Sequence, residues 1–242
     1  MTRFLEILAP AKINLFLRVT GRRQDGYHEL VTLMCCVSLY DKIALTFGKR
    51  DITVTCAHPE VPQDQTNLAQ VAARLFFENH TRHSSNRDQG VEIAITKRIP
   101  VAAGLGGGSS DAAAVLLGLN RHYDNPFAKH ELRAMGQKIG ADVPFFLDRK
   151  PAIATGIGEK LKPYNRLKPL KVLLVYPGFG VSTAGVYEKL NLGLTKCEKT
   201  LKDVHFETAG LDIAEYVCND LETVTLAAHP ELSAIKESLL SL

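Results

Sequence analysis

Four of the five residues from Gly104 to Gly108 are glycine, and two serines follow them. A backbone this free of side chains can bring its N–H groups close to a ligand, and the start of a helix adds the positive end of its dipole. The run "DAAAVLLGL" (111–119) is apolar on all sides, which predicts a buried helix that begins near Ser110. We therefore expect a rigid phosphate site here. A tight strand-to-helix turn is the alternative, but such a turn needs only one or two glycines.

The loop differs from the two most familiar nucleotide-binding loops. A Walker A loop requires Gly-Lys-Ser/Thr, whereas Gly108 is followed by two serines and an aspartate. The dinucleotide fingerprint requires a third small residue at position 109, where Ser109 is a poor substitute for glycine. Only the general features of an anion-binding loop therefore remain.

Two predicted strands lead to candidate chemistry. Val91, Ile93 and Ile95 alternate along a strand that ends at Ile99-Pro100, directly before the loop. In "AKINLFLRV" (11–19) the aliphatic residues alternate in the same way, so Lys12 and Asn14 are expected on the opposite face of a half-buried strand.

The remaining pattern mixes strands and helices and predicts an α+β fold. We expect strands at 29–39, 42–47 and 51–57, helices at 66–80 and 129–140, a connector at 162–171, a buried strand at 172–177 and mostly helical segments at 182–190 and 219–242. The first helix has Thr66 or Asn67 as its cap.

Composition excludes several classes of protein. The 242 residues carry a formal charge of +3, and their lysines and arginines are scattered, unlike those of a nucleic-acid-binding module. No apolar stretch is long enough for a membrane span, so a membrane partner is not expected. The eight histidines form no metal-binding pattern. The five cysteines are odd in number and include no C-x-x-C pair, which predicts free thiols and therefore a reducing, cytoplasmic location.

Three separated stretches, "PAKINLFLRVTGRRQDGYHEL" (10–30), "PVAAGLGGGSSDAA" (100–113) and "GADVPFFL" (140–147), resemble motifs of the GHMP kinases. Within that family the match narrows to members that phosphorylate the C2 hydroxyl of a cytidine diphosphate methylerythritol, in the non-mevalonate (MEP) route to isoprenoid precursors. The resemblance implies a two-domain GHMP kinase fold, with a ribosomal-protein-like N-terminal α/β domain at 1–162 and a C-terminal α+β domain at 163–242.

The resemblance also implies roles for single residues. It places the catalytic pair at Lys12 and Asp142, the latter as the base that takes a proton from the attacking hydroxyl. Without the resemblance, Asp142 would be interpreted as a helix N-cap and Lys12 as a solvated strand residue. Substrate contacts fall on Asn14, Tyr27, His28 and Tyr187, with Tyr27 and Tyr187 on either side of the pyrimidine and His28 at its edge.

ATP and Mg²⁺ are the implied cofactors. The nucleotide is expected on the loop and at the start of the first helix, that is, on Pro100, Val101, Ala102, Ala103, Gly104, Leu105, Gly106, Gly107, Gly108, Ser109, Ser110 and Asn67. The hydroxyl of Ser109 or Ser110 is a candidate magnesium ligand. Asp111 is another candidate, although an aspartate near a helix start is more often stabilised by the dipole.

The chain departs from the family pattern at its C-terminal end. GHMP kinases carry a third glycine-rich motif of the "SGSGPT" kind, whereas this sequence ends at "KESLLSL". We therefore expect an incomplete C-terminal domain. The alternatives to the cytidine-substrate kinase are a GHMP kinase of the homoserine or mevalonate type and a nucleotide-binding remnant with little activity; the sequence gives no oligomeric state.

Overall fold

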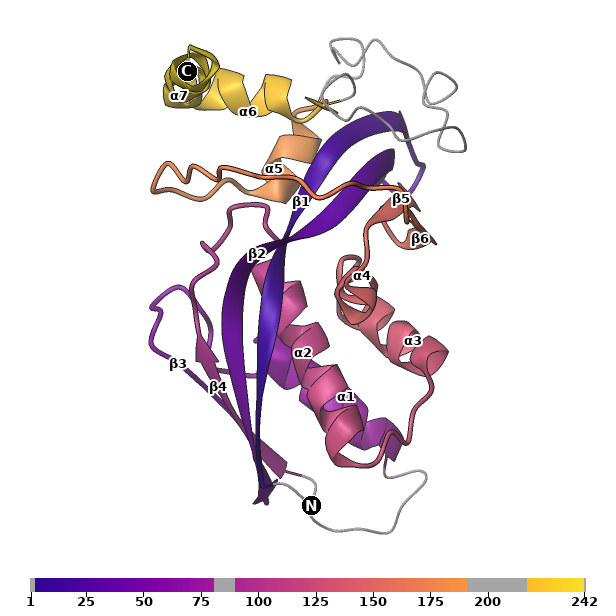
Figure 1. Ribbon diagram of the computed structural model, residues 1–242. Coiled ribbons are helices and arrows are strands. Elements are labelled where there is room, and N and C mark those ends of the chain that lie inside the picture. The colour runs from indigo at the N-terminus through magenta and orange to yellow at the C-terminus, as the bar shows by residue number, and fades with distance from the viewer. Residues whose placement is uncertain (1–2, 81–89, 191–216, 242) are drawn as a thin grey trace. The chain divides into compact units, whose positions relative to one another are not determined.

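The computed structural model describes residues 3–80, 90–190 and 217–241, which combine helices and strands as an α+β fold (Figure 1). They divide into two compact units. The first contains the described residues of Met1–Lys12, Cys36–Val101 and Leu105–Lys150, and the second contains those of Ile13–Cys35, Ala102–Gly104 and Pro151–Leu242. The division at residue 162 into two sequence domains stays a prediction.

The first unit is a sheet with helices packed on one face. Its strand order is β3-β4-β2-β1, formed by β3 (Ile52–Cys56), β4 (Gly90–Thr96) and the parts of β1 (Phe4–Arg22) and β2 (His28–Lys49) that belong to this unit. Its helices are α1 (Leu68–His80), α2 (Gly107–His122), α3 (Lys129–Ile139) and α4 (Val143–Asp148). Helix α2 packs against the other three, and its side chains from Ala112 to Leu116 are fully buried, as the apolar sequence predicted.

Gly118 explains how closely α2 approaches the sheet. A Cβ at this position would lie 2.5 Å from Leu45 Cδ1 and 2.6 Å from Ile7 Cδ1. Glycine lowers helix stability, and here it is retained because any side chain would push the helix off the strands.

In the described residues, the second unit contains parts of β1 and β2 with three further strands and three helices. Strand β2 pairs antiparallel with β5 (Ala152–Gly156), which pairs with β6 (Lys160–Pro163), and β1 pairs parallel with the short β7 (Cys218–Asn219). Three helices complete the unit: α5 (Thr183–Glu188), α6 (Glu222–Ala228) and α7 (Pro230–Leu240). Its core cluster consists of Phe16, Val31, Leu33, Ile153 and Tyr164.

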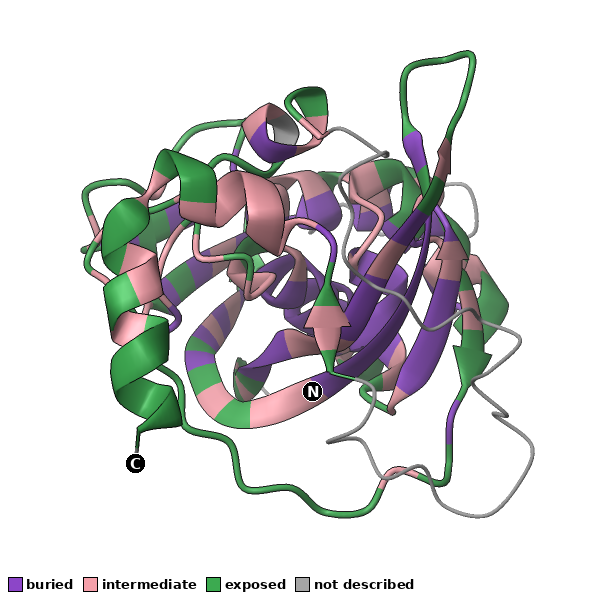
Figure 2. Cartoon of the chain, turned by 90° about the horizontal axis from the view of Figure 1, so that it is seen from above, coloured by how far each residue is buried: buried purple, intermediate pink, exposed green. Residues whose placement is uncertain are grey.

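The buried residues lie mainly on the strands of the sheet and not on the last two helices. Figure 2 shows buried residues along the strands, whereas the helix next to the C-terminus is mostly exposed. Helices α6 and α7 bury none of their residues. Among the helices in the described ranges, none combines the length and the apolar character that crossing a bilayer requires.

Several expectations need correction. The segments 29–39 and 42–47 form one continuous strand, β2, because Asp41 between them is buried and paired instead of turning the chain. Strand β1 is not half-buried in the expected way, because Lys12 and Phe16, on the face opposite the aliphatic residues, are both buried.

The buried strand expected at 172–177 is also wrong. These residues form no regular element in the structure, and the side chains from Val172 to Tyr176 are 40–74% exposed. A strand needs a hydrogen-bonded neighbour, and no described strand pairs with this segment. Its apolar composition therefore has no sheet face to pack on.

Candidate active site

The glycine loop connects the end of β4 to α2. The helix begins at Gly107 rather than near Ser110, and Gly106 is its N-cap with φ +70°. Gly104 also has a positive φ, +73°, a conformation that side-chain-bearing residues rarely adopt. Ala102, at φ +55°, adopts it as well, and its carbonyl accepts a hydrogen bond from the Val181 N–H within the second unit. The first turn of α2 therefore presents N–H groups that no side chain caps.

Lys12 connects the loop to the predicted base. Its side chain is 10% exposed, and its backbone N–H donates to the carbonyl of Leu105 at 2.9 Å. Its Nζ lies 3.5 Å from Asp142 Oδ2. A Cβ on Gly106 would approach Lys12 Cγ to 3.1 Å. The first unit therefore brings the two predicted catalytic residues together beside the loop.

Asp142 stands at the start of a helix, where an aspartate is usually interpreted as an N-cap, but it does not act as one. It stands at the N-cap of α4, yet its side chain makes no capping hydrogen bond, and Pro144 supports the helix start. Its carboxylate is 32% exposed and forms an ion pair with Lys12. The acid is thus available for chemistry, and its role stays a prediction.

The two serines differ in their surroundings. Ser110 is buried, and its hydroxyl has no hydrogen-bond partner among the residues that the structure describes. Ser109 is half-buried, and its Oγ would lie 3.7 Å from a Cβ on Gly140, two residues before Asp142. Within the described part of the chain, no three His, Cys, Asp or Glu side chains are arranged to hold a metal ion.

A buried charge cluster lies at the start of α2. It consists of Asp41, Lys97 and Asp111, with Lys97 Nζ paired to Asp41 Oδ2 and lying 3.1 Å from Asp111 Oδ2. The pKa of Lys97 is raised, because Asp111 and Asp41 outweigh the effect of burial. The Oδ2 of Asp111 is therefore held by a lysine, and the role of Asp111 as a magnesium ligand stays a prediction.

The sequence analysis missed Asp41 and Lys97, although a signal was present. Lys97 continues the period of two through Val91, Ile93 and Ile95, and Asp41 does the same ahead of Ile43. Asp41 is fully buried on β2, and the side chain of Lys97, directly after β4, is 6% exposed. An acid and a base in apolar register on two candidate strands predict a buried ion pair.

The cluster predicts how stability depends on pH. Burial raises the pKa of Asp111 to about 7, and Asp41 adds to this effect while Lys97 opposes it. The folded chain thus holds a proton that the unfolded chain has released, and the free energy of unfolding falls as pH rises toward 7. Between pH 5 and 8, we expect the free energy of unfolding of Asp111→Asn to fall by roughly 2–3 kcal/mol less than that of the wild type. Urea unfolding of both proteins across this range measures it, and parallel curves would contradict it.

Asn67 caps α1, as one of the two sequence alternatives predicted. Its Oδ1 accepts from the Ala69 N–H at 2.9 Å, and its Nδ2 donates to the Pro62 carbonyl at 2.6 Å. The side chain is buried and holds the helix start. Its contact with adenine stays a prediction.

The predicted substrate residues lie in the second unit. His28 stacks on Tyr187 with ring centroids 5.3 Å apart. Burial and the charge of Arg22 lower the pKa of His28, so its ring is neutral at pH 7 and offers one donor and one acceptor. Tyr27 is 61% exposed, and Asn14 donates to the Thr32 hydroxyl at 2.6 Å. Two of the four residues are thus in contact, and all four roles stay predictions.

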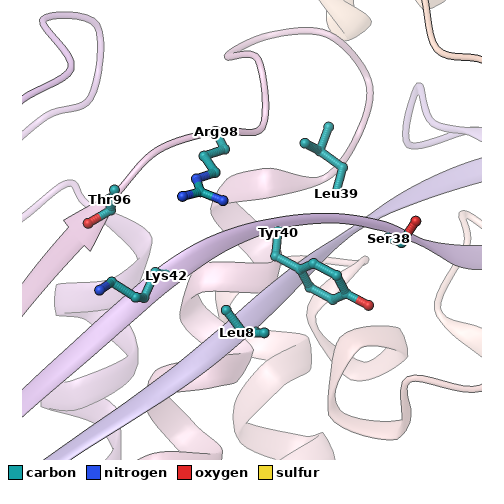
Figure 3. Close-up of a pocket in the computed structure, with 7 residues that line it drawn as sticks. All are labelled: Leu8, Ser38, Leu39, Tyr40, Lys42, Thr96 and Arg98. Carbon is teal, nitrogen blue, oxygen red and sulfur yellow. The ribbon is translucent and has the colours of Figure 1, made fainter.

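A pocket of about 270 Å³ lies in the first unit but contains none of these residues (Figure 3). It is lined by Leu8, Ser38, Leu39, Tyr40, Lys42, Thr96 and Arg98, which come from β1, β2, the last residue of β4 and the segment after it (Figure 3). The candidate active site therefore rests on the geometry around Lys12 and not on this cavity.

Known proteins share these features. The domain family described as "GHMP kinases N terminal domain" matches residues 67–149. A 4-diphosphocytidyl-2-C-methyl-D-erythritol kinase from Syntrophotalea carbinolica is 48% identical over 97% of this chain and 82% of its own length. The enzyme of the same name from Syntrophus aciditrophicus is 44% identical over 98% of this chain and 83% of its own length.

Solved structures agree with this similarity. A crystal structure of 4-(cytidine 5'-diphospho)-2C-methyl-D-erythritol kinase has a TM-score of 0.75 and 35% identity over 98% of this chain and 83% of that chain. A homoserine kinase from Cytophaga hutchinsonii, with a TM-score of 0.54 and 17% identity over 84% of this chain and 63% of its own, shares the fold alone.

Proposed function

Because this chain belongs to the family of 4-diphosphocytidyl-2-C-methyl-D-erythritol kinases, we propose that it transfers the γ-phosphoryl group of ATP to the C2 hydroxyl of 4-diphosphocytidyl-2-C-methyl-D-erythritol. This is the kinase step of the non-mevalonate route to isoprenoid precursors. A cytoplasmic location is part of the same proposal.

One observation carries the proposal most directly. The backbone of Lys12 holds the glycine loop at Leu105, while its side chain lies 3.5 Å from Asp142. A single residue thus joins the structure that would bind a triphosphate to the acid that would activate an alcohol. Phosphoryl transfer needs positioning and charge stabilisation more than covalent catalysis, and this arrangement provides both.

In the proposed mechanism, Asp142 accepts the proton of the attacking hydroxyl. The ammonium of Lys12 pairs with this carboxylate and offsets negative charge that develops on the transferred group. Backbone N–H groups of the loop and of the first turn of α2 hold the phosphates. Lys12, Asp142 and the loop residues from Leu105 to the first turn of α2 belong to one unit of the chain.

Magnesium is the less direct part of the proposal. Asp111 is engaged by Lys97, so the hydroxyl oxygens of Ser109 and Ser110 are the groups that fit the ion best, alongside oxygens of the triphosphate. When bound, Mg²⁺ would neutralise charge on the phosphates.

Recognition of the base is assigned to the second unit. A neutral His28 can donate a hydrogen bond to the edge of a pyrimidine and accept one from it. The ring of Tyr187 stacks on the ring of His28. A homoserine or mevalonate kinase has no base to recognise, so this pair favours the cytidine substrate.

An assay of ADP release tests the function. We expect turnover with ATP, Mg²⁺ and the cytidine substrate, and none with homoserine or mevalonate. Phosphorus NMR of the product should show a new phosphate monoester at C2. Turnover with homoserine or mevalonate alone would assign a different kinase, and ATP binding without turnover on any of the three would reject catalysis.

A further inference from the structure

The buried cluster of Asp41, Lys97 and Asp111 has no part in the proposed chemistry. Asp41 is fully buried, and the side chains of Lys97 and Asp111 are 6% and 5% exposed. Their ion pairs join them to one another, and the candidate base Asp142 belongs to a separate ion pair with Lys12. Their function has to be sought in what they hold together.

The contacts of Asp41 reach the entry to the glycine loop. Its Oδ1 accepts from the backbone N–H of Arg98 at 2.6 Å and of Ile99 at 2.9 Å, the last residues before Pro100. Its Oδ2 pairs with Lys97. One carboxylate on β2 thus fixes three consecutive residues where the chain leaves β4.

Lys97 extends this anchor to the exit from the loop. Its Nζ lies 3.1 Å from Asp111 Oδ2, on the second turn of α2. A Cβ on Gly107 would lie 3.0 Å from Lys97 Nζ and 3.5 Å from Asp41 Oδ2. The backbone at the helix start therefore rests directly on the ion pair, and both ends of the loop are tied to the same three side chains.

Stability alone is a weak explanation for this cluster. Removing charges from water costs several kcal/mol per ion, and apolar side chains of similar volume often stabilise a protein as well or better. A buried ionic network does, however, fix one arrangement of the groups that it joins, because its hydrogen bonds are directional. The loop is where a fixed arrangement matters, since its amides must already point at the phosphates.

We propose that Asp41 and Lys97 are positioning residues for ATP, which hold the entry and exit of the glycine loop so that its amides converge on the triphosphate. They act through the backbone of residues 98–107 and touch neither substrate. The inference rests on the proposed function, because it takes the loop to be the ATP site.

The kinetic consequence is selective. Loosening the loop adds an ordering cost to ATP binding, while the second substrate does not bear that cost. For Asp41→Asn we expect KM for ATP to rise about tenfold or more, because small displacements of positioning groups have effects of this size. KM for the cytidine substrate should change by less than about twofold.

The experiment compares Asp41→Asn and Lys97→Met with a matched control, Asn120→Ala. Asn120 is also buried on α2, at the far end, where its amide bonds the N–H and carbonyl of Phe127 at 3.1 Å each. The control should lower the melting temperature without changing KM for ATP. Lys97→Arg, which keeps the charge, should retain ATP affinity better than Lys97→Met. If Asp41→Asn does not fold, the comparison of these two Lys97 variants takes its place.

Calorimetric titration of ATP into each protein separates the two proposals. If the wild type binds ATP but shows no turnover, the kinase function fails, while the anchor is still tested by the loss of ATP affinity. Unchanged ATP affinity in folded Asp41→Asn or Lys97→Met would overturn the anchor. An equal loss in Asn120→Ala, or an equal rise in both KM values, would overturn it too.

Discussion

Replacing Asp142 with asparagine should lower kcat by about a hundredfold to ten-thousandfold and leave KM for ATP within about twofold, the range expected when a general base is lost. Asparagine has nearly the same shape but cannot accept the proton of the attacking hydroxyl. The carboxylate makes no capping hydrogen bond, so the start of α4 loses nothing. Among the described residues, the contact that the substitution removes is the ion pair with Lys12.

The same substitution at the other end of α4 provides the control. Asp148 forms ion pairs with Lys129 and Arg133, and its side chain is 13% exposed. Asp148→Asn should therefore lower stability and leave kcat close to that of the wild type. Initial rates at varied ATP, together with thermal unfolding, measure both variants. A near-normal kcat in Asp142→Asn would reject its assignment as the base, and a rise in KM for ATP alone would make it a binding contact.

Local patterns in the sequence were sufficient for the elements that carry the loop. Alternation at Val91, Ile93 and Ile95 predicted β4, and the all-round apolar run after the serines predicted that α2 is buried, which is confirmed. These predictions succeed because burial on one strand face or around one helix leaves its own periodicity in the chain. The start of α2 was misplaced by one turn, since Gly107 and Gly108 are poor helix formers that the surrounding structure nevertheless holds in the helix.

Long-range pairings could not be predicted in the same way. Lys12 and Asp142 are 130 positions apart, and only the resemblance to a kinase family connected them before the structure placed them 3.5 Å apart. The sequence predicted two strands, 29–39 and 42–47, where the structure has the single strand β2 with Asp41 buried within it. Its partner Lys97 directly follows β4, more than 50 positions along the chain, so the ion pair that compensates the buried charge is absent from the sequence around Asp41.

The exposed segment 172–177 illustrates the converse error. Its composition is that of a buried strand, but composition cannot supply the neighbour that a strand requires. Burial is a property of the sheet face, and in the described structure no sheet face receives these side chains.

Gly106→Ala should reduce kcat/KM for ATP by about a hundredfold, because the loop and the catalytic lysine are packed against each other at this residue. An added Cβ would lie 2.8 Å from Phe146 Cζ and 3.1 Å from Lys12 Cγ. Phe146 is fully buried and cannot yield, so the displacement falls on the loop or on Lys12. The positive φ of Gly106 adds a backbone cost of about 1–2 kcal/mol.

Gly48→Ala separates backbone strain from the clash. Gly48 has nearly the same φ, +77°, but a Cβ there would meet no atom within 4 Å, and the residue lies outside the candidate site. Both variants should lose stability, whereas only Gly106→Ala should lose catalytic efficiency. Steady-state kinetics and melting temperatures of the two proteins distinguish these effects. If Gly106→Ala kept the kinetics of Gly48→Ala, the close approach of loop and lysine would have no catalytic importance, and the argument that one residue joins the phosphate loop to the base would fail with it.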